Sequence, residues 1–156
     1  MNNLNQEKLE SLILKEVNAV RKRKRLSTLV LDSTLSLAAK DHAGYLKKIK
    51  KLSHNQKIKS KKTPMKRTDF YGGSFKSVGE NIAFSYIGKD VNSANHKRKT
   101  VNLSTYAETA RHLFRLWYYS KPHLQNLKDK DYRKTSIRFS IDKKLKRIYA
   151  VQVFAS

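Results

Sequence analysis

Apolar residues recur every three or four positions in two N-terminal stretches of the chain, which predicts two amphipathic helices. The first spans residues 4–25 and ends in an unbroken run of Lys and Arg, where the helix dipole favours positive charge. A cap from Asp32 or Ser33 begins the second helix, which is expected to end near Leu52. His42 lies on the apolar side of this helix, so we expect it in or beside the core.

The middle of the chain has a less regular pattern. A lysine-rich stretch predicts an exposed loop, a helical turn follows at residues 65–70, and residues 78–84 predict a short strand. Helical spacing resumes after a cap from Ser104 or Thr105, and Pro122 is expected to end this third helix.

The C-terminal stretch predicts a β-hairpin, with strands at 137–141 and 148–154 joined by a polar turn. The second strand is apolar on both faces, with Tyr149, Val151 and Val153 on one side and Ile148, Ala150 and Phe154 on the other. Helices must then cover both sides of the sheet. We therefore predict an α/β (α+β) fold, a three-layer α/β/α sandwich with a small, mainly antiparallel central sheet.

Length and composition narrow the class of protein. With 156 residues and no internal repeat, we expect a single domain over 1–156, in which residues 1–6 form a polar stub that suits a tether. The absence of cysteine excludes disulfides, zinc fingers, iron-sulfur clusters and Cys nucleophiles. A formal charge of +23, from 35 Lys and Arg against 12 Asp and Glu, indicates an acidic partner or surface.

The sequence also bears on where the protein acts. No run approaches the length of a membrane span, and the first residues lack the basic and apolar regions of an export signal. The chain is thus expected to be either intracellular or a mature protein whose signal, together with a lipid-anchoring Cys, has been removed.

Candidate chemistry lies at the ends of three predicted elements. These segments are Leu52-Ser53-His54, Gly79-Glu80-Asn81 and Trp117-Tyr118-Tyr119-Ser120-Lys121-Pro122-His123. Their order and spacing resemble those of the CAP superfamily of cysteine-rich secretory, antigen 5 and pathogenesis-related 1 proteins, in its bacterial, disulfide-free branch. Further matching pieces are Asn18-x-x-Arg21, Leu31-Asp32-x-x-Leu35-x-x-x-Ala39-x-x-x-Ala43, Arg67, Ile82-Ala83 and Val151-Gln152-Val153-Phe154.

The resemblance implies a CAP-type sandwich with a central cleft lined by His54, Glu80 and His123, a ligand set that Zn²⁺ accepts. No cofactor is required on this interpretation. A second acidic ligand would fall at Ser120, so the full set of four ligands is absent. Asn81 and Arg67 are expected to brace the cleft by hydrogen bonds.

The same three residues also allow a purely structural interpretation. His54, Glu80 and His123 then form a polar clasp between helix ends and sheet, and Glu80→Ala should destabilise the fold by about 1–3 kcal/mol. Trp117 lies on the core stripe of its helix and is expected to pack there, although it also suits a ligand cleft. His112 is expected on the basic exterior, together with His96.

Three functions follow from these features. The first is an extracellular or cell-surface, non-enzymatic binding module for lipids or sterols, anionic glycans or host proteins. The Lys- and Asn-rich composition is typical of an AT-rich bacterial genome, and together with the polar N-terminal stub and the resemblance it suggests a spirochaetal surface lipoprotein of this family. The second is a metal-dependent hydrolase in which Glu80 acts as general base, His54 and His123 hold a metal-bound water and Ser120 orients the substrate. The third is a non-specific nucleic-acid binder that uses the basic clusters at 21–25, 57–62 and 143–147, although charge alone supports it and we rank it last.

Overall fold

A four-stranded sheet lies at the centre of the computed structural model, which describes residues 4–92 and 100–156. Its strand order is β1-β5-β6-β2, in which β1 pairs parallel with β5 and the other pairs are antiparallel. These strands are β1 (Val30–Leu31), β2 (Val78–Tyr86), β5 (Lys134–Asp142) and β6 (Arg147–Ala155). A separate antiparallel pair joins β3 (Asp90–Asn92) to β4 (Thr100–Asn102).

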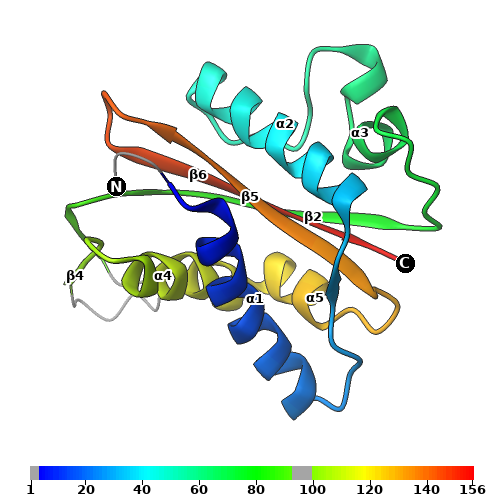
Figure 1. The fold of residues 1–156 in the computed structure, drawn as a ribbon, viewed down its shortest axis with the longest axis horizontal. Coiled ribbons are helices and arrows are strands. Elements are labelled where there is room, and N and C mark those ends of the chain that lie inside the picture. The colour runs from blue at the N-terminus through cyan, green and yellow to red at the C-terminus, as the bar shows by residue number, and fades with distance from the viewer. Residues whose placement is uncertain (1–3, 93–99) are drawn as a thin grey trace.

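Helices cover both faces of the central sheet (Figure 1). One face carries α1 (Gln6–Arg23), α4 (Tyr106–Tyr118) and α5 (Lys121–Lys128). The other carries α2 (Ser33–Ile49) and α3 (Pro64–Phe70), with the short 3₁₀ turn η1 (Lys59–Lys61) between them in sequence. The predicted three-layer sandwich with a mainly antiparallel sheet is therefore confirmed.

The two faces of β6 divide the apolar interior into two clusters. Ile148, Ala150 and Phe154 belong to the cluster beneath α1, α4 and α5. Tyr149, Val151 and Val153 belong to the cluster beneath α2, as the alternation of this strand predicts. Because β6 is buried along nearly its whole length, it is the strand around which both layers pack.

Side-chain caps fix where the long helices begin. Asp32 accepts hydrogen bonds from the backbone of the first turn of α2, and Thr105 forms a capping box with Glu108 at the start of α4. Asn5 caps α1 in the same way, and the Gln6 side chain bonds to the backbone of β5. Residues 4–6, which we assigned to a tether, are thus part of the folded domain, and residues 1–3 lie outside the described chain.

Two expectations about the elements were wrong. Pro122 does not end the third helix, which stops at Tyr118, but stands in the first turn of α5, where its missing N–H has no helical partner to lose. The second helix ends at Ile49, three residues early, because Lys50 adopts a left-handed conformation. The two-residue strand β1 was not predicted.

Two histidines lie in the interior of the fold. His42 is fully buried, as expected, but His112 is also buried on the inner side of α4, which corrects its assignment to the exterior. Burial lowers the pKa of His112, and nearby Arg115 lowers it further. Trp117 is fully buried in the larger cluster, so it packs in the core as predicted. His96 lies outside the described residues.

Candidate functional site

The loop after α2, helix α3 and strand β2 meet at Glu80 of β2. Its Oε1 accepts a hydrogen bond from His54 Nδ1 at 2.9 Å, and its Oε2 forms an ion pair with Arg67 of α3 at 2.6 Å. The Glu80 side chain is 1% exposed and that of His54 is 51% exposed, so the cluster runs from the interior to the surface. His54 and Glu80 are therefore brought together as predicted.

Arg67, which we expected only to brace the cleft by hydrogen bonds, is the ion-pair partner of Glu80. Its guanidinium is fully buried, and besides the ion pair it donates to the carbonyl oxygens of His54, Lys61 and Lys62 at 3.1–3.3 Å. A single cation therefore fixes the Glu80 carboxylate and also holds the loop before α3 in place.

His42 closes the inner side of the cluster. Its Nε2 donates to the Ser53 carbonyl at 2.7 Å, so Nδ1 is the acceptor for the Gln56 amide at 3.1 Å. Burial lowers the pKa of His42 to about 4, which the charge of Glu80 only partly offsets. His42 is thus neutral at pH 7, and its 3.6 Å approach to Glu80 is not an ion pair under those conditions.

Asn81 connects the sheet to α5. Its amide donates to the His123 carbonyl at 3.1 Å, and its oxygen accepts from Asn126 at 2.8 Å. Asn126 also donates to the Glu80 carbonyl at 3.2 Å. Asn81 thus makes the bracing hydrogen bonds that we expected, whereas Asn126 was not singled out from the sequence.

The remaining candidates stand apart from the carboxylate. His123 Nδ1 is buried and makes no hydrogen bond within the described chain, and burial, followed by the charge of His54, lowers the pKa of this imidazole. Ser120 precedes α5 as its N-cap residue, but its side chain makes no capping hydrogen bond. Neither side chain is hydrogen-bonded to Glu80.

Gly79 is required beside Glu80 because another side chain fills the space that a Cβ would need. A Cβ at this position would overlap the hydroxyl of Tyr132 and lie 3.2 Å from the Asn126 side-chain oxygen. The Gly-Glu-Asn segment thus combines a close approach, an ion-pair acceptor and a bridge to α5.

The ligand set implied for zinc does not fit this arrangement. Both oxygens of Glu80 are already engaged, one by His54 and the other by a guanidinium cation that repels a divalent ion. Over residues 4–92 and 100–156, no three His, Asp or Glu side chains are grouped so that they could hold a metal. The cluster therefore has the geometry of a polar clasp between α3, β2 and the loop after α2. It differs from the predicted clasp in that Arg67 is a member and the His123 side chain is not.

A second buried cation explains the Asn-x-x-Arg segment of the first helix. Arg21 is fully buried and donates to the carbonyl oxygens of Ser27, Leu127, Asp129 and Tyr132 at 2.7–3.1 Å. Asn18 bonds to both the N–H and the carbonyl of Leu29. This segment therefore ties the loops after α1 and α5 to α1 and has a structural role.

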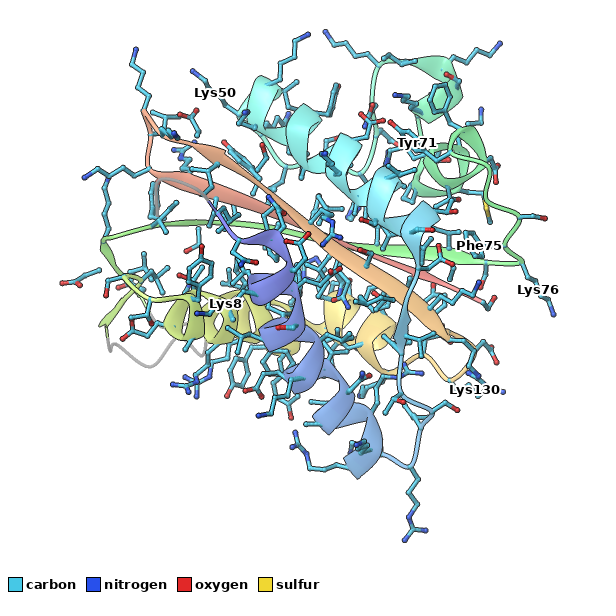
Figure 2. The ribbon with its side chains drawn as sticks, in the orientation of Figure 1. Lys8, Lys50, Tyr71, Phe75, Lys76 and Lys130 are labelled. Carbon is cyan, nitrogen blue, oxygen red and sulfur yellow. The ribbon has the colours of Figure 1, made fainter. Side chains whose placement is uncertain are left out.

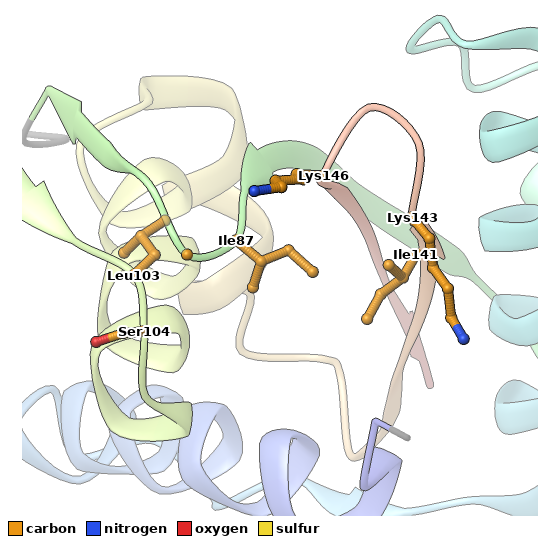
Figure 3. Close-up of a pocket in the computed structure, with 7 residues that line it drawn as sticks. Ile87, Leu103, Ser104, Ile141, Lys143 and Lys146 are labelled. Atoms are coloured by element: carbon orange, nitrogen blue, oxygen red, sulfur yellow. The ribbon is translucent and has the colours of Figure 1, made fainter. Parts of the chain in front are cut away.

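A pocket of about 310 Å³ lies at the other end of β2 (Figure 3). Ile87, Leu103 and Ile141 give it an apolar lining, while Lys143 and Lys146 of the β5–β6 turn lie at its side. It shares no residue with the clasp. This pocket was not predicted, because its walls come from separate parts of the chain: the residues after β2, those before α4, and the end of β5 with its turn.

Comparison with known proteins gives two kinds of similarity. The family model described as the cysteine-rich secretory protein family, CAP, matches residues 14–154. No curated protein matched the chain. Among solved structures, an outer surface protein of Borrelia burgdorferi is similar with a TM-score of 0.74 and 20% identity, covering 99% of this chain and 96% of that one.

Two other solved structures extend the likeness. An extracellular protein of Bacillus anthracis with an SCP domain is similar with a TM-score of 0.71 and 18% identity. The match covers 96% of this chain but only 41% of that protein, so this chain corresponds to one part of it. The structure of NaASP2 with Zn²⁺ is similar with a TM-score of 0.61 and 14% identity, over 95% of this chain and 79% of the other. At these identities, the likeness establishes the fold.

Proposed function

Since the chain belongs to the cysteine-rich secretory protein (CAP) family, we propose that it is an extracellular binding module that engages anionic ligands through its basic exterior and catalyses no reaction. One observation carries the second half of this proposal. Glu80, the only carboxylate among the predicted cleft residues, is buried and held by Arg67 and His54. It is not free to act as a general base or as a metal ligand.

The distribution of charge supports an anionic ligand. The chain has 35 Lys and Arg against 12 Asp and Glu. Several of these acidic residues are taken up within the fold: Glu10 pairs with Arg138, Glu80 with Arg67 and Asp32 with Lys134. The lysines instead extend into solvent, as Lys50, Lys76 and Lys130 do in Figure 2. Each of these pairs is neutral, so the formal net charge of +23 is carried by the other basic side chains and makes the potential outside the molecule positive.

Two of the similar structures support an extracellular location. They are described as an outer surface protein and an extracellular protein. In the described part of this chain, no helix has the length and apolar character needed to cross a membrane. A lipid anchor attached on the N-terminal side of the folded domain would account for attachment to a cell surface, and it is part of the proposal.

Salt-dependent binding tests the proposal. The protein is titrated against a sulfated polysaccharide and against vesicles that contain phosphatidylglycerol, with dextran and pure phosphatidylcholine vesicles as uncharged controls. We expect binding to at least one anionic probe, weakening steeply as NaCl is raised, because exposed charges are screened over about 10 Å at 0.1 M salt. Failure to bind any anionic probe at low salt would contradict the proposal.

Duplex DNA belongs in the same experiment as a competitor. The basic clusters that suggested nucleic-acid binding come without a recognition helix or base-stacking aromatics, so DNA should compete weakly and independently of its sequence. Tight, sequence-dependent binding of DNA that persists at high salt would favour the nucleic-acid hypothesis over ours.

A further inference from the structure

Three large apolar side chains are exposed around the α2–α3 region of the molecule. Ile58, in the loop before η1, is 56% exposed, Phe70 at the end of α3 is 53% exposed and Leu37 on α2 is 49% exposed. Exposed apolar residues scattered singly are ordinary on protein surfaces. These three, however, lie along one continuous strip.

Two shallow hollows establish that continuity. Ile58 and Phe70 line the first together with Lys59 and Lys66. Ile58 also lines the second, together with Leu37, Lys40 and Lys48. We define the α2–α3 patch by its members, which are Leu37, Lys40, Lys48, Ile58, Lys59, Lys66 and Phe70.

The fold holds this patch in a fixed shape. Lys61 pairs with Asp41 at 2.9 Å, donates to the Tyr71 hydroxyl at 3.2 Å and places its ammonium 4.2 Å from the centre of the Phe70 ring. From below, Arg67 binds the carbonyl of the same lysine. Because the loop that carries Ile58 is already ordered, little conformational entropy is lost when the patch binds.

The charges of the patch are strongly one-sided. Its four lysines are exposed, and Lys57 and Lys62 flank them with exposed side chains. The acidic residues nearby are Asp41, which is paired with Lys61, and Asp69, which lines the first hollow. Apolar side chains surrounded by lysines form an amphipathic surface that complements a sheet of negative charge lying over a hydrocarbon layer.

We propose that the α2–α3 patch docks the domain onto an anionic lipid bilayer, with Ile58 and Phe70 entering the headgroup–acyl boundary and the lysines contacting lipid phosphates. This inference rests on the proposed function and names its ligand class. A sulfated glycan offers no hydrocarbon to cover Ile58 and Phe70. A protein partner is a poorer match, because lysine is depleted in protein–protein interfaces whereas this patch is rich in it.

The direct test is sedimentation with vesicles made of phosphatidylglycerol and phosphatidylcholine in equal parts. Ile58→Ser Phe70→Ser is compared with Val30→Ser Leu31→Ser, whose side chains on β1 are 56% and 54% exposed and lie off the patch. About half of each of the Ile58 and Phe70 side chains is exposed and would be buried in the bilayer. Losing this apolar contact at both positions should weaken vesicle binding by about 10- to 100-fold. The β1 variant should bind like the wild type.

A matched pair of charge variants separates the patch from general attraction. Lys59→Glu Lys66→Glu and Lys143→Glu Lys144→Glu change the net charge equally, but the second pair lies in the β5–β6 turn. The patch variant should bind vesicles much more weakly than the turn variant. Insertion is read from Phe70→Trp, whose fluorescence brominated lipid should quench, while Trp117 is fully buried and stays unquenched.

Different results would overturn docking through the α2–α3 patch, the lipid ligand, or the proposed function as a whole. Equal binding by the Ser variants, equal loss in both charge variants, or no quenching of the Trp at position 70 would overturn docking through this patch. Binding to sulfated polysaccharide without binding to vesicles would overturn the lipid inference and leave the proposed function standing. Absence of binding to both probes at low salt would remove both proposals.

Discussion

Glu80→Ala tests the clasp at the centre of the fold. The substitution removes a carboxylate whose side chain is 1% exposed and leaves the Arg67 guanidinium, which is fully buried, without its counter-charge. It also frees His54, but that side chain is half exposed and regains solvent. Nearly all of the loss should therefore come from the buried arginine.

The structure gives this loss a magnitude. Breaking a buried ion pair by removing one partner destabilises proteins by about 3–5 kcal/mol, since the remaining charge stays desolvated. This exceeds the roughly 1–3 kcal/mol that the sequence predicts, which applies to a neutral buried group that loses its hydrogen bond. The difference between the two values is the cost of leaving the buried Arg67 guanidinium without a counter-charge.

Urea unfolding at pH 7, followed by Trp117 fluorescence, is the assay. Glu7→Ala, at an exposed position in the first turn of α1, is the matched control and should leave stability nearly unchanged. In a double-mutant cycle, Glu80→Ala with Arg67→Met should be less destabilised than the sum of the two single variants by about 2 kcal/mol. If Glu80→Ala left the stability unchanged, or if the two single substitutions were additive, the Glu80–Arg67 ion pair would not stabilise the fold.

Three further changes test the surroundings of the clasp. As the pH is lowered from 6.5 to about 4, the free energy of unfolding should fall by up to about 1.4 kcal/mol per pH unit. The cause is that His42 takes up its proton near pH 6.5 in the unfolded chain but only near pH 4 in the folded protein. Urea unfolding at a series of pH values measures this slope, and His42→Gln should flatten it. Gly79→Ala should destabilise the protein by about 1–3 kcal/mol, since its methyl group overlaps the Tyr132 hydroxyl, and thermal unfolding would contradict this if the midpoint did not move. Asn126→Ala should destabilise by about 1–2 kcal/mol through loss of two hydrogen bonds between α5 and β2, and faster amide exchange in α5 should accompany it.

The layers of the fold could be predicted because their signals are local. Alternation along β6 assigned each apolar side chain to the correct cluster before any helix was placed. The misreading at Pro122 had a local cause as well, since proline both follows helices and occupies their first turn. The strand β1 was missed because two exposed residues show no alternation, and only the distant β5 makes them a strand.

The candidate site was predictable in its residues but not in its pairing. His54, Glu80 and Asn81 were identified from their segments, and the structure brings the first two into contact. The pairing of Arg67 with Glu80 was not predicted. It depends on how α3 packs against β2, and the spacing of residues along the chain does not determine that packing. His112 shows the same limit, because the basic residues around it indicated an exterior position although its own face of α4 is buried.

The non-enzymatic function that we propose depends on His54 and Arg67 occupying both oxygens of Glu80, so that this carboxylate neither holds a metal nor acts as a base. Calorimetric titration of Zn²⁺ into the metal-stripped protein at neutral pH, beside the His54→Ala His123→Ala variant, tests it most directly. We expect the same titration for both proteins, without one-to-one binding. One-to-one binding that disappears in the variant would contradict it, place a metal in the cleft and restore the hydrolase hypothesis.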